Sequence, residues 1–303
     1  MQNNILSALI TPFGADGRLD QKLLEKHVQW QLESGITGFF LHGPIGEGVS
    51  LNEKDWQSVL EIAASQAKHK TILVEITSPV KEVLTRRIKL SEEIGITGVT
   101  ALLPMWFGYS TAVAANYFRH LVEKTSLPVY LHNMPRITGL SVDEAMLKSI
   151  VAETNGRLAG ILECSADWQL YKTFRDILPN GTIYYGRVEG MERAAAEGAI
   201  GVIAATANLC PEAHSILSKL QAIDRKAEAG QLADMLEELA KSIHVGQPVA
   251  AAIKAVLTKL ERCTCWTGFP VVPLTGPKWE QWVSGVVQQV VEIEGFCHKI
   301  QNN

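Results

Sequence analysis

Short apolar segments alternate with amphipathic segments over the first two thirds of the chain. Most of the apolar segments lack a strict alternation of apolar and polar residues, which is typical of parallel strands covered on both faces. Each is followed by a stretch in which apolar residues recur three or four positions apart, as in a helix with one buried face. We predict eight strands, at Ile5–Thr11, Gly38–His42, Thr71–Thr77, Gly98–Leu103, Pro128–His132, Leu158–Glu163, Thr182–Gly186 and Gly201–Thr206.

Alternation of strands and helices predicts a parallel sheet, and eight such units favour its closure into a barrel. A Gly-Ile-Thr-Gly motif at residues 35–38 recurs at 95–98, each time where a helix is expected to end in glycine before the next strand. The predicted fold class is therefore α/β, a (β/α)8 TIM barrel with a C-terminal helical extension. The intervening helices are predicted at Leu19–Ser34, Glu53–Lys68, Lys81–Ile94, Ala112–Thr125, Val142–Glu153, Gln169–Leu178 and Met191–Glu197.

The last third of the chain has no further strand pattern. Residues 213–260 are rich in alanine and leucine and predict two or three packed helices, residues 261–277 predict a proline-rich loop, and Lys278–Gln301 predicts a closing helix. We therefore divide the chain into a barrel at residues 1–212 and a C-terminal helical region at 213–303 packed on that barrel.

Composition narrows the functional classes. The formal net charge is −4 and no basic block occurs, so we expect no nucleic-acid partner. We also expect no membrane span, because no apolar run reaches about 18 residues, and no signal peptide. The five cysteines form no CxxC pair, which favours a reduced, cytoplasmic protein. Cys263 and Cys265 could bind a metal, but no second ligand pair follows them.

The carboxyl ends of the strands are where barrel enzymes place their active sites. Strand two ends in Gly43-Pro44-Ile45-Gly46, where glycines allow backbone amides to approach a carboxylate or phosphate. An ordinary glycine-rich turn is the alternative interpretation of this loop.

Residues that can carry charge lie in or directly after three other strands. Glu75 interrupts an apolar run, so it needs a cation, a donor or water, and either a site or a structural ion pair would satisfy it. His132 ends strand five and could act as an acid or base. Arg187 could hold a carboxylate, or pair with Glu189. In contrast, none of the eight predicted strands contains a lysine, the residue that a class I aldolase needs for its Schiff base.

Several segments together resemble the dihydrodipicolinate synthase and N-acetylneuraminate lyase family over nearly the whole chain. The resemblance implies the barrel fold, lyase chemistry on small 2-oxo or sugar acids, and a homo-oligomer, either a dimer or a tetramer. The matching segments, in family order, are Ala8–Phe13, His42–Glu47, Leu127–Pro135, Gly160–Glu163, Thr206–Asn208 and Phe269–Leu274.

The resemblance fails at the residues that carry the family's chemistry. Leu162 occupies the position of the family's Schiff-base lysine, and His132 occupies the position of the family's proton-relaying tyrosine. Pro44 and Ile45 replace the two loop threonines. Two further positions depart from the family pattern. Trp106 aligns with the tyrosine that crosses the dimer interface, although Tyr109 could reach back. Ile137 aligns with the carboxylate-binding arginine, and Arg136 lies one place from it.

The sequence supports two functional hypotheses. The first is a lyase-type enzyme that acts on a small 2-oxo or sugar acid without a Schiff-base lysine, with His132 and Glu75 as catalytic residues. No cofactor is expected, although Glu75, His132 and Glu189 could hold a divalent metal. The alternative is a non-catalytic member that binds a metabolite or a partner subunit. The predicted substrate-binding residues are Gly43, Pro44, Ile45, Gly46, Trp106, Arg136, Leu162, Arg187 and Glu189.

Overall fold

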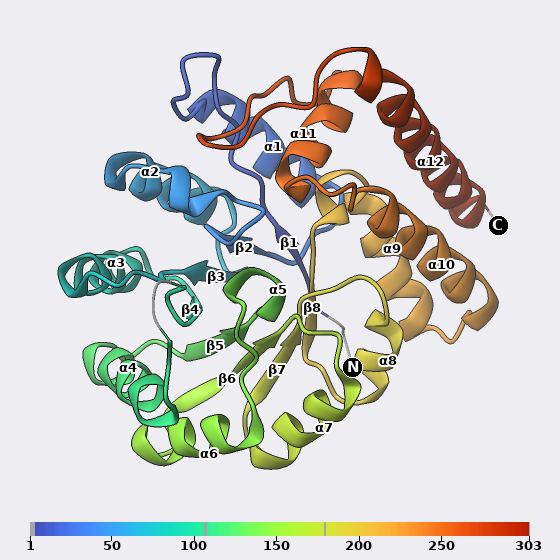
Figure 1. The fold of residues 1–303 in the computed structure, drawn as a ribbon. Coiled ribbons are helices and arrows are strands. Elements are labelled where there is room, and N and C mark those ends of the chain that lie inside the picture. Colours follow the sequence, from blue (N-terminus) through green and yellow to red (C-terminus); the bar gives the residue numbers. More distant parts are fainter. Residues whose placement is uncertain (1–3, 106–107, 179, 303) are drawn as a thin grey trace.

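A computed structural model describes residues 4–105, 108–178 and 180–302. Eight parallel strands pair in chain order, and β8 pairs with β1 to close the barrel. Figure 1 shows the helices arranged around this barrel. The predicted (β/α)8 architecture is confirmed, and the strands are β1 Asn4–Ala8, β2 Gly38–Leu41, β3 Thr71–Glu75, β4 Gly98–Ala101, β5 Val129–Asn133, β6 Leu158–Glu163, β7 Thr182–Tyr185 and β8 Gly201–Ala204.

The helices between the strands lie close to their predicted positions. They bury one face against the sheet, as Leu24, His27, Val28 and Gln31 of α1 do. The helices as far as β8 are α1 Gln21–Glu33, α2 Glu53–Gln66, α3 Lys81–Ile94, α4 Thr111–Lys124, α5 Pro135–Thr138, α6 Glu144–Glu153, α7 Trp168–Ile177 and α8 Met191–Ala196, and a 3-10 turn, η1, spans Gly48–Ser50.

Two strands are shorter than predicted, because side chains take over the hydrogen bonds of the backbone at their ends. The first strand was expected to reach Thr11 but ends at Ala8, and the amide of Ile10 donates to Asn208 Oδ1. The third strand ends at Glu75, because the next free amide, that of Thr77, donates to the Glu75 carboxylate.

Two helices begin later than their apolar pattern suggested. The α1 helix begins at Gln21 and not at Leu19, because the Asp20 carboxylate caps it by accepting from the amide of Leu23. Likewise, α6 begins after the cap Asp143. The short α5 helix was missed, because four residues are too few to show a periodicity.

Two tyrosines fill the barrel interior below its carboxyl-terminal end. The rings of Tyr130 and Tyr184 meet edge to face with centroids 5.5 Å apart. Glycines leave room for them: a Cβ on Gly98 would lie 2.9 Å from the Tyr130 ring, and one on Gly201 would lie 3.1 Å from the Tyr184 ring. The barrel is therefore packed at this level, and open space begins above it.

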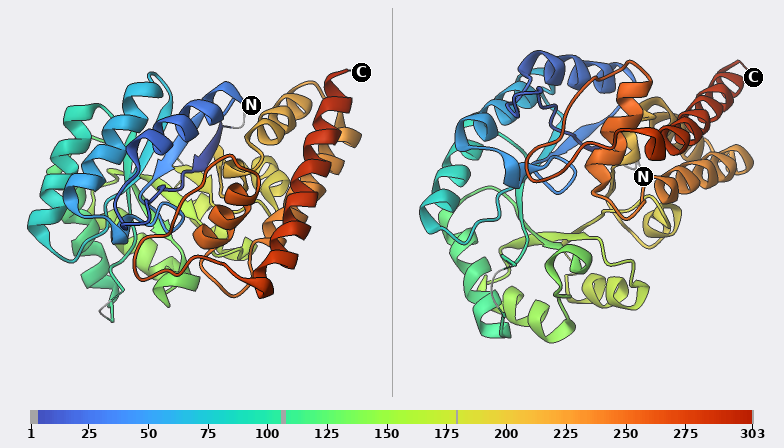
Figure 2. Two further views of the ribbon diagram at one scale, coloured as in Figure 1. Left: turned by 90° about the horizontal axis from the view of Figure 1, so that it is seen from above. Right: turned by 45° about the horizontal axis from the view of Figure 1, so that its top comes forward.

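The C-terminal region consists of α9 Pro211–Ala222, α10 Lys226–Ser242, α11 Val249–Lys259 and α12 Pro277–Gln301, preceded by the 3-10 turn η2 at Thr206–Asn208. The α9 helix contacts β1 and so takes the place of the eighth barrel helix. Figures 1 and 2 show α10 and α12 side by side outside it. The predicted division at residue 212 stays a prediction. Among the described helices, none is both long enough and apolar enough to cross a membrane.

A buried polar cluster joins α1 to the end of β1. His27 Nε2 lies 3.1 Å from Asn208 Oδ1, and Asn208 Nδ2 donates to the carbonyl of Ala8 at 2.7 Å. Burial lowers the pKa of His27 from 6.5 to about 4, although the hydrogen bond with Asn208 acts in the opposite direction. The folded chain therefore holds this ring in its neutral form at neutral pH.

This cluster predicts that acid destabilises the fold. Below about pH 6.5 the unfolded chain takes up a proton on His27, whereas the folded chain does so only near pH 4. We expect this group to lower the unfolding free energy by about 2 kcal/mol between about pH 7.5 and about pH 5. Urea unfolding at both pH values would measure it, with His27→Gln as the matched variant. An unchanged pH dependence in that variant would contradict the assignment.

Candidate active site

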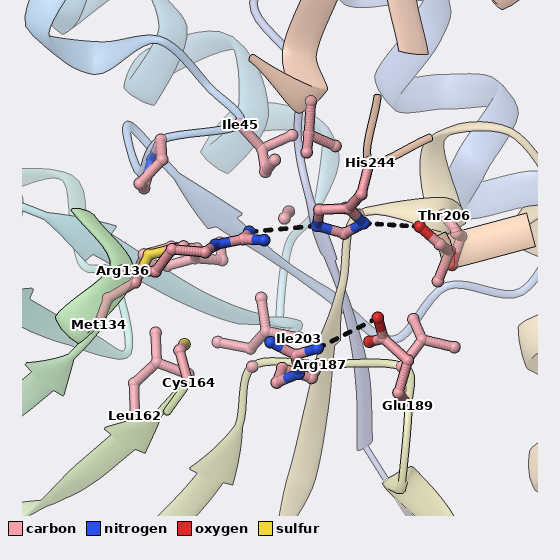
Figure 3. A pocket seen from close by; sticks show the side chains of 18 of the residues that line it. Ile45, Met134, Arg136, Leu162, Cys164, Arg187, Glu189, Ile203, Thr206 and His244 are labelled. Carbon is pink, nitrogen blue, oxygen red and sulfur yellow. Dashed lines mark hydrogen bonds and ion pairs between the residues drawn. The ribbon is translucent and has the colours of Figure 1, made fainter. Parts of the chain in front are cut away.

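A pocket of about 90 Å³ opens at the carboxyl ends of the barrel strands (Figure 3). Its floor and walls come from strands β1, β2, β5, β6 and β8, from the loop that follows β7, and from the segment that joins α10 to α11. It is lined mainly by apolar side chains, with His132, Cys164, two arginines, Glu189, Thr206 and His244 as the groups able to react or to bind charge. This is the position that the barrel fold predicts for an active site.

The side chains of His132 and Glu75 point into the barrel, an orientation that the sequence could not determine. The Nδ1 atom of His132 lies 2.8 Å from Glu75 Oε2. The same carboxylate accepts from the hydroxyl of Thr100 at 2.9 Å, and from both the amide and the hydroxyl of Thr77. Because these neighbours are donors, Glu75 is held as an acceptor that orients the His132 ring.

The thiol of Cys164 stands on the other side of the same ring. Its Sγ lies 3.5 Å from His132 Nε2, and both side chains line the pocket. Sequence reasoning did not select Cys164, although period two places it on the same strand face as Leu162, two residues earlier. Burial raises the pKa of this thiol, while the charges of Arg187 and Arg136 oppose the rise.

Two arginines bring positive charge to the pocket, one from the short helix α5 and one from the loop after β7. Arg136, in α5, has Nη2 at 3.1 Å from His244 Nε2 (Figure 3). The Nδ1 atom of His244 lies 2.6 Å from the carbonyl oxygen of Ala240. The histidine therefore donates through Nδ1 and accepts from the guanidinium through Nε2. His244 was not predicted, because its contact with Arg136 joins segments more than a hundred residues apart.

Arg187, after β7, pairs with Glu189 at 3.2 Å, the alternative that the sequence had left open for these two residues. Both side chains are about a quarter exposed, and the Arg187 Nε atom has no hydrogen-bond partner. The guanidinium is therefore not saturated by Glu189. It retains donors for an anion in the pocket.

The glycine-rich loop contributes its two non-glycine residues to the lining of the pocket. Pro44 and Ile45 line it, and both also line a neighbouring cavity of about 590 Å³. Gly43 lines that second cavity, and a Cβ there would lie 2.3 Å from the Phe40 ring. Gly46 lines neither space and instead accepts through its carbonyl from Thr11. The loop thus presents apolar side chains to the pocket, and its use as an anion cradle stays a prediction.

The neighbouring cavity shares Met134, Arg136 and His244 with the pocket, so the two spaces adjoin. Glu75 lines this cavity, as does His42, whose ring stacks on Trp56 with centroids 4.3 Å apart. Burial, together with the nearby charge of Arg87, lowers the pKa of His42 to about 3. A ligand in this space would therefore meet a neutral imidazole.

Leu162 is buried and lines the pocket from β6, beside His132 on β5 and Tyr184 on β7. Among the described residues, no lysine lines the pocket or the neighbouring cavity. Lys254 is the buried lysine of α11, but its ammonium pairs with Glu47 and lies over the Phe13 ring. Within the part of the chain that the structure describes, the lining of the pocket around Leu162 therefore contains no amine side chain.

The three suggested metal ligands do not converge on one point. Glu75 and His132 bond to each other, whereas Glu189 is held by Arg187. Within residues 4–105, 108–178 and 180–302, no group of three or more His, Cys, Asp or Glu side chains is placed to hold a metal ion. Trp106, predicted to bind substrate, lies outside the described residues.

A model of the Dihydrodipicolinate synthetase family matches residues 1–286 of the chain. The chain belongs to this family. The 4-hydroxy-tetrahydrodipicolinate synthase of Anaplasma marginale (strain St. Maries) is 25% identical over 276 residues, which are 90% of each chain. The N-acetylneuraminate lyase of Enterobacter sp. (strain 638) is 25% identical over 217 residues, covering 71% of this chain and 72% of the lyase.

The fold of this dihydrodipicolinate synthetase family member also matches solved structures. A catalytic lysine mutant of the Ruminococcus gnavus sialic acid aldolase superposes with a TM-score of 0.88 over 97% of both chains, at 17% sequence identity. At that identity the likeness shows the shared fold alone. The family resemblance drawn from the sequence motifs is confirmed, and the two relatives are named as a synthase and a lyase.

Proposed function

We propose that this protein is a lyase-type enzyme that acts on a small 2-oxo or sugar acid without forming a Schiff base. The observation that carries the proposal is that His132, whose ring Glu75 orients, lines the same pocket as two arginines. The arginines would hold the substrate carboxylate, and His132 would move a proton at the carbon beside the carbonyl.

The absence of imine chemistry is part of the proposal. The sialic acid aldolase with the same fold is described as a mutant of its catalytic lysine. In this chain Leu162 lines the pocket, and no lysine is among the described residues that line it. Leucine has no amine, so it cannot condense with a carbonyl. Orientation of the substrate by Arg136 and Arg187, and proton transfer by His132, would have to supply the rate acceleration.

Borohydride trapping tests this proposal directly. The protein would be incubated with pyruvate and sodium borohydride, and its intact mass and peptides measured. We expect no pyruvate adduct on any lysine. This result is compatible with non-covalent binding of pyruvate, which a rise in the melting temperature would detect separately. A reduced adduct on Lys254, or on any other lysine, would overturn the proposal.

The arginines give a prediction on affinity. Replacing Arg187 with methionine removes charged donors from the pocket, and we expect the dissociation constant for pyruvate or a related 2-oxo acid to rise about 10- to 100-fold. Titration by thermal shift or calorimetry would measure it. Arg119→Met, on the exposed face of α4, is the matched control and should leave affinity unchanged. If the Arg187 variant binds with the same affinity as the wild type, Arg187 does not bind the substrate carboxylate.

Binding of a 2-oxo acid without turnover would favour the alternative of a non-catalytic family member. A homo-oligomer and a cytoplasmic location also belong to the proposal. Light scattering of the purified protein would decide the first, and a monomer would contradict it. All five cysteines are free, which is compatible with a reducing compartment.

A further inference from the structure

Cys164, His132 and Glu75 form a chain of contacts that the proposed acid–base role leaves partly unused. The three side chains come from β3, β5 and the end of β6, and all are buried. Glu75 contacts Nδ1 of the imidazole at 2.8 Å, and Cys164 Sγ contacts Nε2 at 3.5 Å. A nucleophile, a base and a carboxylate that orients the base stand in this order in enzymes that work through a covalent intermediate.

The proton positions follow from the acceptors. Glu75 accepts hydrogen bonds from Thr77 and Thr100, so the shared proton of its contact with His132 lies on Nδ1. The Nε2 atom then carries a free electron pair toward the thiol. Because burial raises the pKa of Cys164, the thiol stays protonated at neutral pH and needs such a base in order to react.

The barrel also makes room for this thiol. A Cβ on Gly186, at the end of β7, would lie 2.1 Å from Cys164 Sγ and 3.1 Å from Leu162 Cδ1. Any side chain at position 186 would therefore displace the sulfur. Glycine at this position lets Cys164 reach the pocket, where Arg136 and Arg187 supply the nearest positive charge.

We propose that Cys164 is a catalytic nucleophile that adds to the carbonyl carbon of a small carboxylate-bearing substrate, with His132 as its base. The inference rests on the proposed function for its substrate class. The substrate would be attached to a thiol directly after the carboxyl end of β6, two residues beyond Leu162 on the same face.

The step balances without a co-reactant. His132 Nε2 takes the thiol proton, and the sulfur forms a bond to the carbonyl carbon while the carbon–oxygen π bond breaks. The carbonyl oxygen then takes the proton back from His132, which gives a neutral thiohemiketal and restores the imidazole. The reverse sequence releases the substrate, so no atom or electron is gained or lost.

Alkylation with iodoacetate and iodoacetamide tests the nucleophile without knowledge of the natural substrate. In each case the sulfur bonds to the methylene carbon, iodide leaves, and the thiol proton passes to His132. We expect Cys164 to be modified first among the five cysteines, and His132→Asn to slow its modification about 100-fold. Time courses read by peptide mass spectrometry would give the rates, with Cys210→Ser and Tyr130→Phe as controls that keep them unchanged.

The two reagents separate this inference from the proposed function. Iodoacetate carries a carboxylate, so the arginines should make it react faster at Cys164 than iodoacetamide does, and Arg187→Met should remove that preference. Rapid, His132-dependent modification without a preference would support the nucleophile and contradict the carboxylate site. If Cys164 reacts no faster than Cys210, or equally fast in His132→Asn, the nucleophile is excluded, whether or not pyruvate raises the melting temperature.

Discussion

Replacing His132 with asparagine is expected to slow proton exchange at C3 of pyruvate by about 100- to 10,000-fold, the range that general acid–base catalysis contributes. His132 is the imidazole that both lines the pocket and is oriented by a buried carboxylate. Asparagine can still donate to Glu75, so the carboxylate keeps a partner while the base is lost. Proton NMR in deuterated water would follow the exchange.

Tyr130→Phe is the matched control for this experiment. It lies on the same strand, two residues before His132, and packs against Tyr184 below the pocket. Its variant should keep the wild-type exchange rate. An exchange rate in His132→Asn equal to that of the wild type would exclude His132 as the base, and the acid–base part of the proposal would then fail.

The second large effect is expected at the buried ion pair of Lys254 and Glu47. Both side chains are almost completely buried, and Glu47 also accepts from the amide of Gly268 at 2.8 Å. Burial raises the pKa of Glu47, and the Lys254 ammonium opposes that rise. Lys254→Met would leave the carboxylate without its cation, and we expect the unfolding free energy to fall by about 3–5 kcal/mol.

Urea unfolding followed by circular dichroism would measure this loss. The double variant Lys254→Met with Glu47→Gln should recover part of the stability, because no unpaired charge stays buried. Lys148→Met breaks an exposed pair with Glu144 on α6 and should cost less than about 1 kcal/mol. If Lys254→Met is no more destabilising than Lys148→Met, the pair does not stabilise the fold.

The buried pair also shows a contact that sequence reasoning could not find. Lys254 lies in α11 and does not line the pocket. Nothing local in the sequence, however, links it to Glu47, which is 207 residues away. The link exists because α11 lies against the glycine-rich loop in the folded chain.

The sequence by itself determined the barrel. Strand–helix alternation needs only local periodicity, so all eight strands were located, with errors at ends such as Thr11 and Thr77 where side chains replace backbone partners. The sequence also placed Leu162 and His132 at strand ends, because position along a barrel strand fixes which end a residue occupies.

Only the tertiary structure decided how these strand ends combine. Closure of the barrel brings Glu75 of β3 against His132 of β5, and pairing of β5 with β6 brings Cys164 to the other ring nitrogen. It also joins Arg136 to His244, across 108 residues. Such contacts depend on the register of the strands and the path of distant loops, and these are set by the packing of the whole molecule, which no local pattern of residues encodes.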